Sequence, residues 1–252
     1  MLLYKYRKFD KEERTWDIIR NNELYFSSFR GFNDPFDCNL DFKIDDDYTS
    51  EDIDKFKNRI SERRKIPKSK LDKGLSLEEY AKELKGYILD MKEKSGILSM
   101  SCNCKNILMW SHYADNHKGL CFGFSFDSQD KCFSKGSPVK YSNDDEYLPI
   151  NVFAVEYEKE LTRLFTIKSK YWEYEEEFRF ITINSKGLKR FSKQTLKEII
   201  FGCKASKENI KTTIQLCNDN GFQHIQFKKA KKVINKFELE FENIKKEDYL
   251  LI

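Results

Sequence analysis

The sequence predicts an α+β fold with a mixed or split β-sheet core, flanking helices and a helical insertion at about residues 48–96. Segments in which apolar and polar side chains alternate recur along most of the chain, as expected for strands. Helical patterns separate them at irregular intervals, whereas a doubly wound parallel sheet requires regular alternation. With 39% hydrophobic and 15% aromatic residues, the 252-residue chain has enough apolar material for a single domain over residues 1–252.

The first predicted unit is a strand, a short helix and a second strand. Residues 2–7 (LLYKYR) alternate as a strand does, and Asp10 with Glu13 can cap the helix that follows. The second strand covers residues 24–28 (LYFSS). Residues 29–37 (FRGFNDPFD) are rich in turn formers, so we expect a loop that its phenylalanines fasten to the core.

The helical insertion is predicted from capping signals and from apolar spacing. Ser76 and Glu79 have the spacing of a capping box, apolar residues follow at helical intervals, and Gly96 stands where a C-terminal cap is expected. An earlier helix carries Ile53 and Phe56. The apolar stripes of these helices are narrow, which predicts that they pack on the sheet and do not form a separate domain.

The rest of the chain is predicted to consist mainly of strands. Two helices are expected among them, at residues 106–117 and 206–221. The expected strands cover residues 96–101, 118–126, 138–142, 150–158, 176–183, 198–202, 224–227 and 236–242.

The charge balance does not indicate a class of partner. The chain has 46 basic and 42 acidic residues, a net charge of +4, in which neither sign dominates. Lysines gather locally at residues 204–211 and in FKKAKK (residues 227–232). These lysines are the best candidates for contacts with a nucleic-acid or protein target.

Cysteine usage and hydropathy predict a cytoplasmic protein. The seven cysteines are odd in number and scattered, which is typical of reduced thiols and not of a disulfide framework. No apolar run approaches 18 residues, and the N-terminal residues lack the apolar core of a signal peptide. We therefore expect no contact with a membrane.

Metal and phosphate motifs are weak or absent. Cys102, Cys104, His112 and His117 could be proposed as zinc ligands, but a CxC pair is not a zinc knuckle and histidines five apart lie on different sides of a helix. The chain has no GxxxxGK loop, no GxGxxG after a strand and no GxSxG elbow. No metal cofactor is expected.

The acidic segment YWEYEEEFRF (residues 171–180) is the strongest candidate for a site. In a strand, Glu175, Glu177 and Arg179 would share one face, while Glu176 and Phe178 would share the other. Such charges can be an ordinary exposed face with weak cross-strand pairs. Aromatic residues before the acids favour a functional site instead.

The residue types suit an enzyme that breaks the nicotinamide bond of NAD. A carboxylate must stabilise the oxocarbenium ion that forms as nicotinamide leaves, and a cation, a hydroxyl group and an aromatic ring must hold the dinucleotide. His112 lies beside two of the candidate rings, in a segment dense in polar side chains. The candidates are Arg7 as anchor, Ser27 or Ser28 as hydroxyl, Tyr25, Trp110 or Tyr113 as stacking ring, and Glu175 or Glu177 as catalytic acid.

Two resemblances add to these patterns. The blocks LYKYR, ELYFSS, FNDPFD, ILMWSHYADNHKGLCFGF and YWEYEEEFRF, spread from residue 2 to about residue 202, resemble an uncharacterised bacterial family. The order of an arginine after a first strand, a serine after a second and a late Glu-x-Glu is similar to that in ADP-ribosyltransferases. That resemblance implies NAD as substrate and matches Arg7, Ser27 and Glu177, with Glu175 two positions earlier.

The expected function is therefore ADP-ribosyl transfer to a macromolecule or NAD hydrolysis, as an intracellular toxin or phage-defence effector. This interpretation requires Arg7, Ser27 and Glu177 to converge on one cleft. A non-catalytic nucleic-acid or protein interaction module is the alternative, in which the segment MWSHYADNHKG faces a groove or a partner. A metal-dependent nuclease would instead bring Asp34 or Asp37 close to the glutamates. Otherwise, residues 33–35 form a turn and Asp37 pairs with an arginine.

Overall fold

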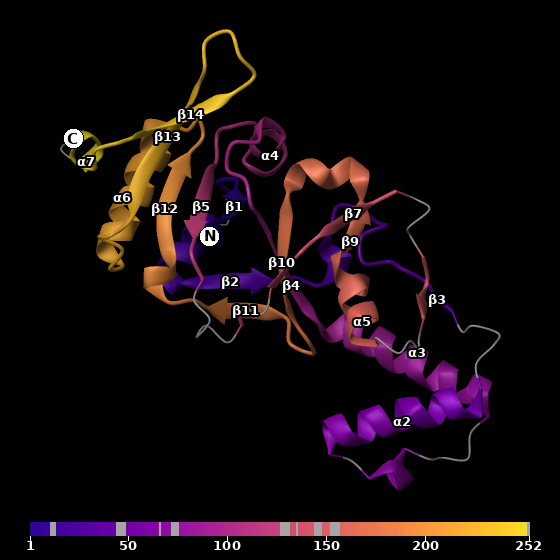
Figure 1. Cartoon of the computed structure of the whole chain (residues 1–252). Coiled ribbons are helices and arrows are strands. Elements are labelled where there is room, and N and C mark those ends of the chain that lie inside the picture. Colours follow the sequence, from indigo (N-terminus) through magenta and orange to yellow (C-terminus); the bar gives the residue numbers. More distant parts are fainter. Residues whose placement is uncertain are drawn as a thin grey trace.

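The computed structural model describes residues 1–10, 14–43, 49–65, 67–71, 76–126, 132–134, 136–143, 148–151 and 157–250. Its centre is an eight-stranded mixed sheet (Figure 1). In spatial order the strands are β14 (Leu239–Asn243), β13 (Gln226–Lys232), β12 (Leu196–Phe201), β5 (Leu120–Phe124), β1 (Leu3–Arg7), β4 (Gly96–Ser101), β10 (Glu177–Thr182) and β6 (Gly136–Pro138).

Smaller sheets and helices surround this centre. The two-stranded sheets pair β2 (Glu23–Phe26) with β11 (Gly187–Arg190), β3 (Phe42–Lys43) with β8 (Ile150–Asn151), and β7 (Lys140–Ser142) with β9 (Ile167–Ser169). The helices are α1 (Arg14–Asn21), α2 (Ser50–Arg64), α3 (Leu77–Lys94), α4 (Ile107–Tyr113), α5 (Tyr157–Thr166), α6 (Lys207–Asp219) and α7 (Glu247–Leu250). Short 3-10 helices are η1 (Phe29–Gly31), η2 (Lys68–Lys70), η4 (Lys170–Glu175) and η5 (Lys193–Thr195). The predicted α+β class is confirmed.

Both faces of the large sheet are covered. On one face, α1 and α6 pack Ile19 and Ile210 against a cluster that includes Phe122 and Ile199. On the other face, α4 packs Trp110 against residues such as Tyr6, Cys121 and Ile200. Because side chains of a strand alternate between faces, neighbouring residues such as Ile199 and Ile200 contribute to different clusters.

The sheet opens between β1 and β4. Strand β1 pairs with β5 along its whole length but with β4 only at Tyr4 and Ser101. The beginning of β4 instead pairs with Ser27, which exchanges two backbone hydrogen bonds with Ile97. Strands β1 and β4 therefore meet at Tyr4 and Ser101 and diverge from there. Side chains line the space between them.

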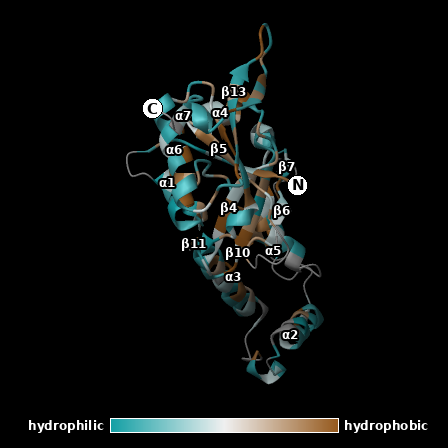
Figure 2. Cartoon of the chain, turned by 90° about the vertical axis from the view of Figure 1, so that its left-hand side faces the viewer, coloured by the Kyte–Doolittle hydropathy of each residue, from teal (hydrophilic) through white to brown (hydrophobic). Residues whose placement is uncertain are grey.

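The insertion contains two capped helices. Thr49 with Asp52 and Ser76 with Glu79 form complete capping boxes, and the second of these confirms the prediction. Figures 1 and 2 show α2 at the end of the molecule opposite to β13. Helix α3 contributes Ile88 and Met91 to a buried cluster that also holds Ile97 of β4. None of the described helices is long and apolar enough to cross a membrane.

Several predicted boundaries were wrong. Gly96 begins β4 and does not cap α3, whose C-cap is Ser95. Helix α4 ends at Tyr113, since the following turn has left-handed backbone at three residues, Asp115, Asn116 and His117. The strand expected at residues 150–158 ends at residue 151 in the described part, and α5 starts at Tyr157, while residues 152–156 lie outside the described ranges.

The acidic segment is also not a continuous strand. Residues 170–175 form η4, and Glu176 has left-handed backbone with φ of 43°. Strand β10 begins at Glu177, which is the partner of Ser101, the last residue of β4. Residues before Glu177 have no part of β4 left to pair with, which explains why the strand starts there. The predicted shared face of Glu177 and Arg179 is confirmed, because β10 carries both on the side away from Phe178.

Candidate functional site

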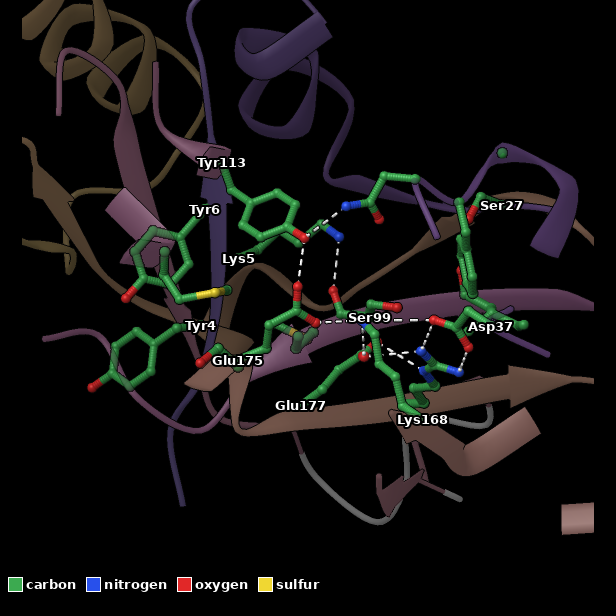
Figure 3. Close-up of a pocket in the computed structure, with 18 of the residues that line it drawn as sticks. Tyr4, Lys5, Tyr6, Ser27, Asp37, Ser99, Tyr113, Lys168, Glu175 and Glu177 are labelled. Carbon is green, nitrogen blue, oxygen red and sulfur yellow. Dashed lines mark hydrogen bonds and ion pairs between the residues drawn. The ribbon is translucent and has the colours of Figure 1, made fainter. Parts of the chain in front are cut away.

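Two adjoining cavities lie where β1 and β4 diverge, and we call them the small and the large cavity. Their volumes are about 290 and 710 Å³. Cavities of roughly 300–1,000 Å³ commonly bind small molecules. The two cavities share Lys5, Tyr6, Tyr25, Ser27 and Tyr113 in their walls. Figure 3 shows side chains around the small cavity coming from β1, α4, β4 and the segment around Glu175.

A buried arginine organises one wall of the small cavity. Arg179 is 0% exposed and binds Asp37 through two bonds, Nη1 to Oδ1 at 2.8 Å and Nη2 to Oδ2 at 2.6 Å. It also donates from Nε to Oε1 of Glu177 at 2.8 Å and from Nη1 to the carbonyl of Phe165 at 2.7 Å. Phe32 stacks over the guanidinium group, with 5.2 Å from Cζ to the ring centroid. The prediction that Asp37 pairs with an arginine is confirmed.

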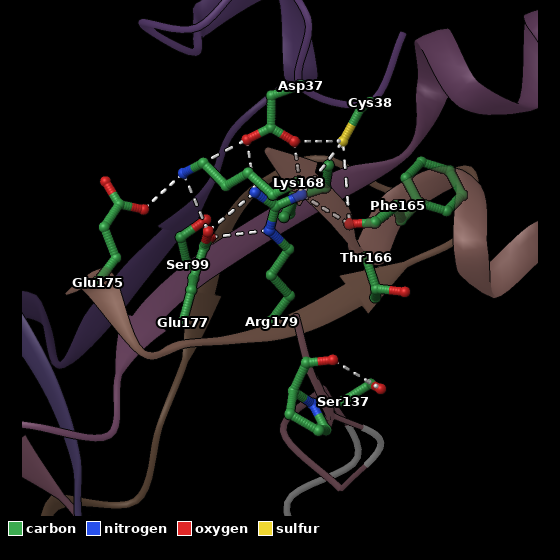
Figure 4. A network of polar contacts seen from close by, with 12 residues as sticks. Asp37, Cys38, Ser99, Ser137, Phe165, Thr166, Lys168, Glu175, Glu177 and Arg179 are labelled. Atoms are coloured by element: carbon green, nitrogen blue, oxygen red, sulfur yellow. Dashed lines mark hydrogen bonds and ion pairs between the residues drawn. The ribbon is translucent and has the colours of Figure 1, made fainter. Parts of the chain in front are cut away.

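Lys168 of β9 is the second cation of this network (Figure 4). Its Nζ lies 2.5 Å from Oε2 of Glu175, 3.2 Å from Oε2 of Glu177 and 3.6 Å from Oδ2 of Asp37. Burial opposes the charge of Glu177, but Arg179 and Lys168 outweigh it and lower the pKa of Glu177 to about 2. Burial likewise opposes the charge of Lys168, but the acids raise its pKa.

Glu175 is less tightly held than Glu177. Its Oε1 accepts from the hydroxyl of Tyr113 at 2.5 Å and its Oε2 accepts from Lys168, so each oxygen has one partner. A carboxylate oxygen can accept two hydrogen bonds, and Glu175 therefore keeps acceptor capacity. Burial and the hydrogen bond to Glu175 raise the pKa of Tyr113. Asn33 donates to the same hydroxyl at 3.3 Å.

The interpretation of the acids as an ordinary exposed face is wrong. Glu175, Glu177 and Arg179 are 4%, 5% and 0% exposed. Burying charged groups is costly unless they are paired, so the network has to form as a unit. Three carboxylates meet two cations in it, and Glu175 is the one that Arg179 does not touch.

The structure brings together five of the predicted site residues. The small cavity is lined by Tyr25, Ser27, Tyr113, Glu175 and Glu177. Ser28 instead caps η1 by accepting from the backbone NH of Arg30. Tyr25 is 60% exposed and lies at the rim of both cavities.

Besides Ser28, three predicted residues lie outside the small cavity. Arg7 lines the large cavity and not the small one, so Arg7, Ser27 and Glu177 do not converge on one cavity but line two that adjoin. His112 also lines the large cavity, and its Nδ1 lies 3.1 Å from the hydroxyl of Tyr174. Trp110 is 0% exposed, and the proposal that it stacks on a ligand is wrong.

The position of Trp110 follows from the packing of α4. Its Nε1 donates to the carbonyl of Cys104 at 2.8 Å, and its ring meets Tyr6 edge-on with centroids 5.2 Å apart. The ring is therefore part of the core beneath the sheet. Tyr113, three positions later, reaches the cavities instead.

Sequence reasoning missed Lys5, Asn33 and Lys168. Lys5 had a signal, because it is two positions before Arg7 in an alternating strand. Asn33 and Lys168 had none, since Asn33 meets Tyr113 and Lys168 meets Asp37, which are residues far away in the chain.

The geometry does not fit the metal-dependent nuclease. Asp37 and Glu177 are near one another, but Arg179 and Lys168 lie between them and neutralise both. In the part of the chain that the structure describes, no three His, Cys, Asp or Glu side chains are grouped to hold a metal ion. Asp34 accepts from the backbone NH of Phe36 at 2.9 Å, as the turn interpretation predicted.

Comparison with known proteins finds one matching family model, over part of the chain, and no activity. Residues 109–180 match a family model described as a protein of unknown function (DUF2971). This stretch runs from α4 to β10 and includes Tyr113, Lys168 and the paired Glu177 and Arg179. The predicted resemblance to an uncharacterised family is therefore confirmed over these residues. No curated protein and no solved structure matches the chain.

Proposed function

We propose that the two cavities bind NAD and that the protein cleaves the bond between nicotinamide and ribose, as ADP-ribosyltransferase-like enzymes do. One observation carries this proposal: the small cavity gathers a hydroxyl, aromatic rings and two carboxylates. Ser27 and Tyr25 come from the end of β2, Tyr113 from α4, and the glutamates from η4 and β10.

The chemistry needs negative charge near the ribose. When the N-glycosidic bond breaks, its electron pair goes to the nicotinamide ring, which becomes neutral, and the positive charge moves to the ribose. A carboxylate fixed in a site with little water stabilises that charge more strongly in the transition state than in the substrate. Water or an acceptor nucleophile then forms the new bond at the ribose and loses a proton.

The hydrogen bonds divide the roles of the two glutamates. Among the described residues, Glu175 accepts hydrogen bonds from Lys168 and Tyr113 alone and retains acceptor capacity, so it is the carboxylate that faces the ribose in this proposal. Glu177 accepts from Arg179 on both oxygens and is held in the wall. Glu177 is then a positioning residue that fixes Arg179 and Lys168 around the site.

The acceptor is a nucleic acid or a protein in the transferase form of the proposal, and water in the hydrolase form. Either form would suit an intracellular toxin or a phage-defence effector, because both consume NAD. The lysine-rich β13 strand offers a basic surface for an acceptor.

The experiment follows free nicotinamide by mass spectrometry after incubating the purified protein with NAD, alone and with RNA, DNA or protein. We expect release by the natural protein and a loss of about 10²-fold or more in Glu175→Gln, the size of effect known for single groups that stabilise transition-state charge. Glu176→Gln is the matched control, because Glu176 is exposed and lies between the two buried acids.

The outcomes separate the candidate functions. Release that persists in Glu175→Gln would remove the assigned role of that carboxylate. Binding of NAD without any release would indicate a non-catalytic module, and absence of both binding and release would overturn the proposal. Glu177→Gln should also lower release, but together with a lower melting temperature.

A further inference from the structure

Lys5 is half-buried, and its ammonium group forms no ion pair with a described acid, although the charges of Glu177 and Glu175 favour its protonated form. Its Nζ donates to the backbone carbonyl of Ser99 at 2.7 Å, across the opening between β1 and β4. Among the described residues, no carboxylate lies within ion-pair distance of it. Burial first, and then the charge of Arg7, lowers the pKa of Lys5 to about 8.

Arg7 is a second cation that forms no ion pair among the described residues. Its Nε is buried and has no hydrogen-bond partner among the described residues. Burial lowers the pKa of Arg7. The charge of Asp10 raises this pKa, but its carboxylate is hydrogen-bonded to the backbone NH and the side chain of Arg14. Asp17 and Glu23 also line the large cavity, and neither forms an ion pair with Arg7.

Lys5 and Arg7 line the same cavity. They are two positions apart on β1, so their side chains leave the same face of the strand, with origins roughly 6.8 Å apart. Both line the large cavity, and Lys5 also lines the small one. Two like charges in a partly buried wall repel each other, which costs stability unless an anion binds between them.

We propose that Lys5 and Arg7 together form a binding site for a diphosphate group. A diphosphate carries a negative charge on each of two neighbouring phosphates. Lys5 and Arg7 are neighbours on one face of β1, so each cation can bind one phosphate. Because Nε of Arg7 is buried and has no partner among the described residues, it is a donor already removed from water and free to bind a phosphate oxygen. The site rests on the proposed function to the extent that NAD supplies the diphosphate.

The position of Lys5 also orients a dinucleotide. Lys5 lies at the junction of the cavities, so a diphosphate there directs one nucleoside into the small cavity towards Glu175 and the other into the large cavity. The nicotinamide ribose occupies the small cavity in this arrangement. Tyr25 and Tyr113, which line both cavities, lie beside the nucleosides.

Titration calorimetry with pyrophosphate, ADP-ribose and NAD tests the site without relying on catalysis. We expect pyrophosphate and ADP-ribose to bind the natural protein, and Lys5→Gln and Arg7→Gln each to weaken both by about 10- to 100-fold, the range for hydrogen bonds to charged groups. Lys245→Gln removes the same charge from an exposed position and should bind as the natural protein does. Lys5→Arg should retain most of the affinity, and thermal unfolding confirms that each variant folds.

The outcomes keep this inference distinct from the proposed function. Diphosphate binding that depends on Lys5 and Arg7, without nicotinamide release, supports the site and removes the NAD-cleaving activity. Nicotinamide release with an unchanged KM in folded Lys5→Gln and Arg7→Gln overturns the site and leaves the activity. Equal weakening by Lys245→Gln would also overturn it, because the effect would then be one of net charge.

Discussion

Asp37 and Arg179 lie 142 positions apart in the chain and form two parallel hydrogen bonds of 2.8 and 2.6 Å, both buried. The pair joins the loop after η1 to strand β10. It also fixes the orientation of the guanidinium group, whose remaining donors bind Glu177 and the carbonyl of Phe165. The wall of the small cavity therefore depends on one arginine.

Arg179→Ala should lower the free energy of unfolding by about 3–5 kcal/mol, because it leaves three buried carboxylates with Lys168 as their one remaining cation in the network. Arg179→Lys should also destabilise, since lysine keeps the charge but cannot form the two-bond contact. Urea denaturation measures both. The control is Arg190→Ala, whose exposed pair with Glu23 is worth about 0–1 kcal/mol. Equal losses for Arg179→Ala and Arg190→Ala would contradict a structural role for the network.

Local patterns predicted a good part of the fold and of the site. The apolar residues after Gly96 placed β4 at Gly96–Ser101, and the period-two geometry of a strand put Glu177 and Arg179 on one face. Capping residues marked the start of α3. These features depend on neighbours in the sequence, and such neighbours are visible without a structure.

The features that were missed depend on distant contacts. Lys168 enters the site because β9 pairs in parallel with β7, and no local signal announces that pairing. The helix of Trp110 carries aromatic residues towards both the sheet and the cavities, so its pattern could not show which ring is buried. Glu175 was expected in a strand, but the end of β4 at Ser101 leaves it in a 3-10 helix.

Tyr113→Phe should separate the positioning of Glu175 from the stability of the fold. It removes one hydrogen bond to the carboxylate, so we expect a loss of about 1 kcal/mol in stability. Because Glu175 then has only Lys168 to orient it, nicotinamide release should fall more than substrate binding does. Urea denaturation and kcat with KM measure the two effects. Tyr171→Phe, at a site 91% exposed, should change neither, and an unchanged kcat in Tyr113→Phe would show that the hydroxyl does not position the acid.

Gly119 is packed too closely for any side chain. A Cβ there would lie 2.2 Å from the backbone oxygen of Arg7, so Gly119→Ala should shift the end of β1. We expect a loss of about 1–3 kcal/mol, as for overpacked positions, together with weaker diphosphate binding. Gly86→Ala is the control with the opposite sign: nothing lies within 4 Å of its Cβ, and alanine should stabilise α3 by about 0.5–1 kcal/mol. Denaturant titration measures the free energy of unfolding of both variants. A Gly119→Ala variant as stable as the natural protein would contradict the close packing at this position.

Diphosphate binding should weaken as the pH rises through about 8. The pKa of Lys5 is about 8 in the folded protein, so its ammonium group is mostly charged at pH 7 and mostly neutral at pH 9. The charged or titratable groups that act on it are Arg7 on the same strand and Glu175 and Glu177 from η4 and β10. The small cavity is also lined by Tyr4, Tyr6, Tyr25, Asp37, Tyr113, Lys168 and Arg179. Burial raises the pKa of Tyr113, and the neighbouring cations lower that of Glu177, so neither of these two titrates between pH 7 and 9.

ADP-ribose is the suitable probe for this prediction, because its diphosphate diester keeps the same charge over the range. A bound anion favours the protonated amine, so binding near pH 8 should take up a proton, and calorimetry in buffers of different ionisation enthalpy detects that uptake. Lys5→Gln should bind weakly at both pH values and without proton uptake. If the variant shows the same pH dependence as the natural protein, the titrating group is not Lys5 and the two-cation site loses its principal support.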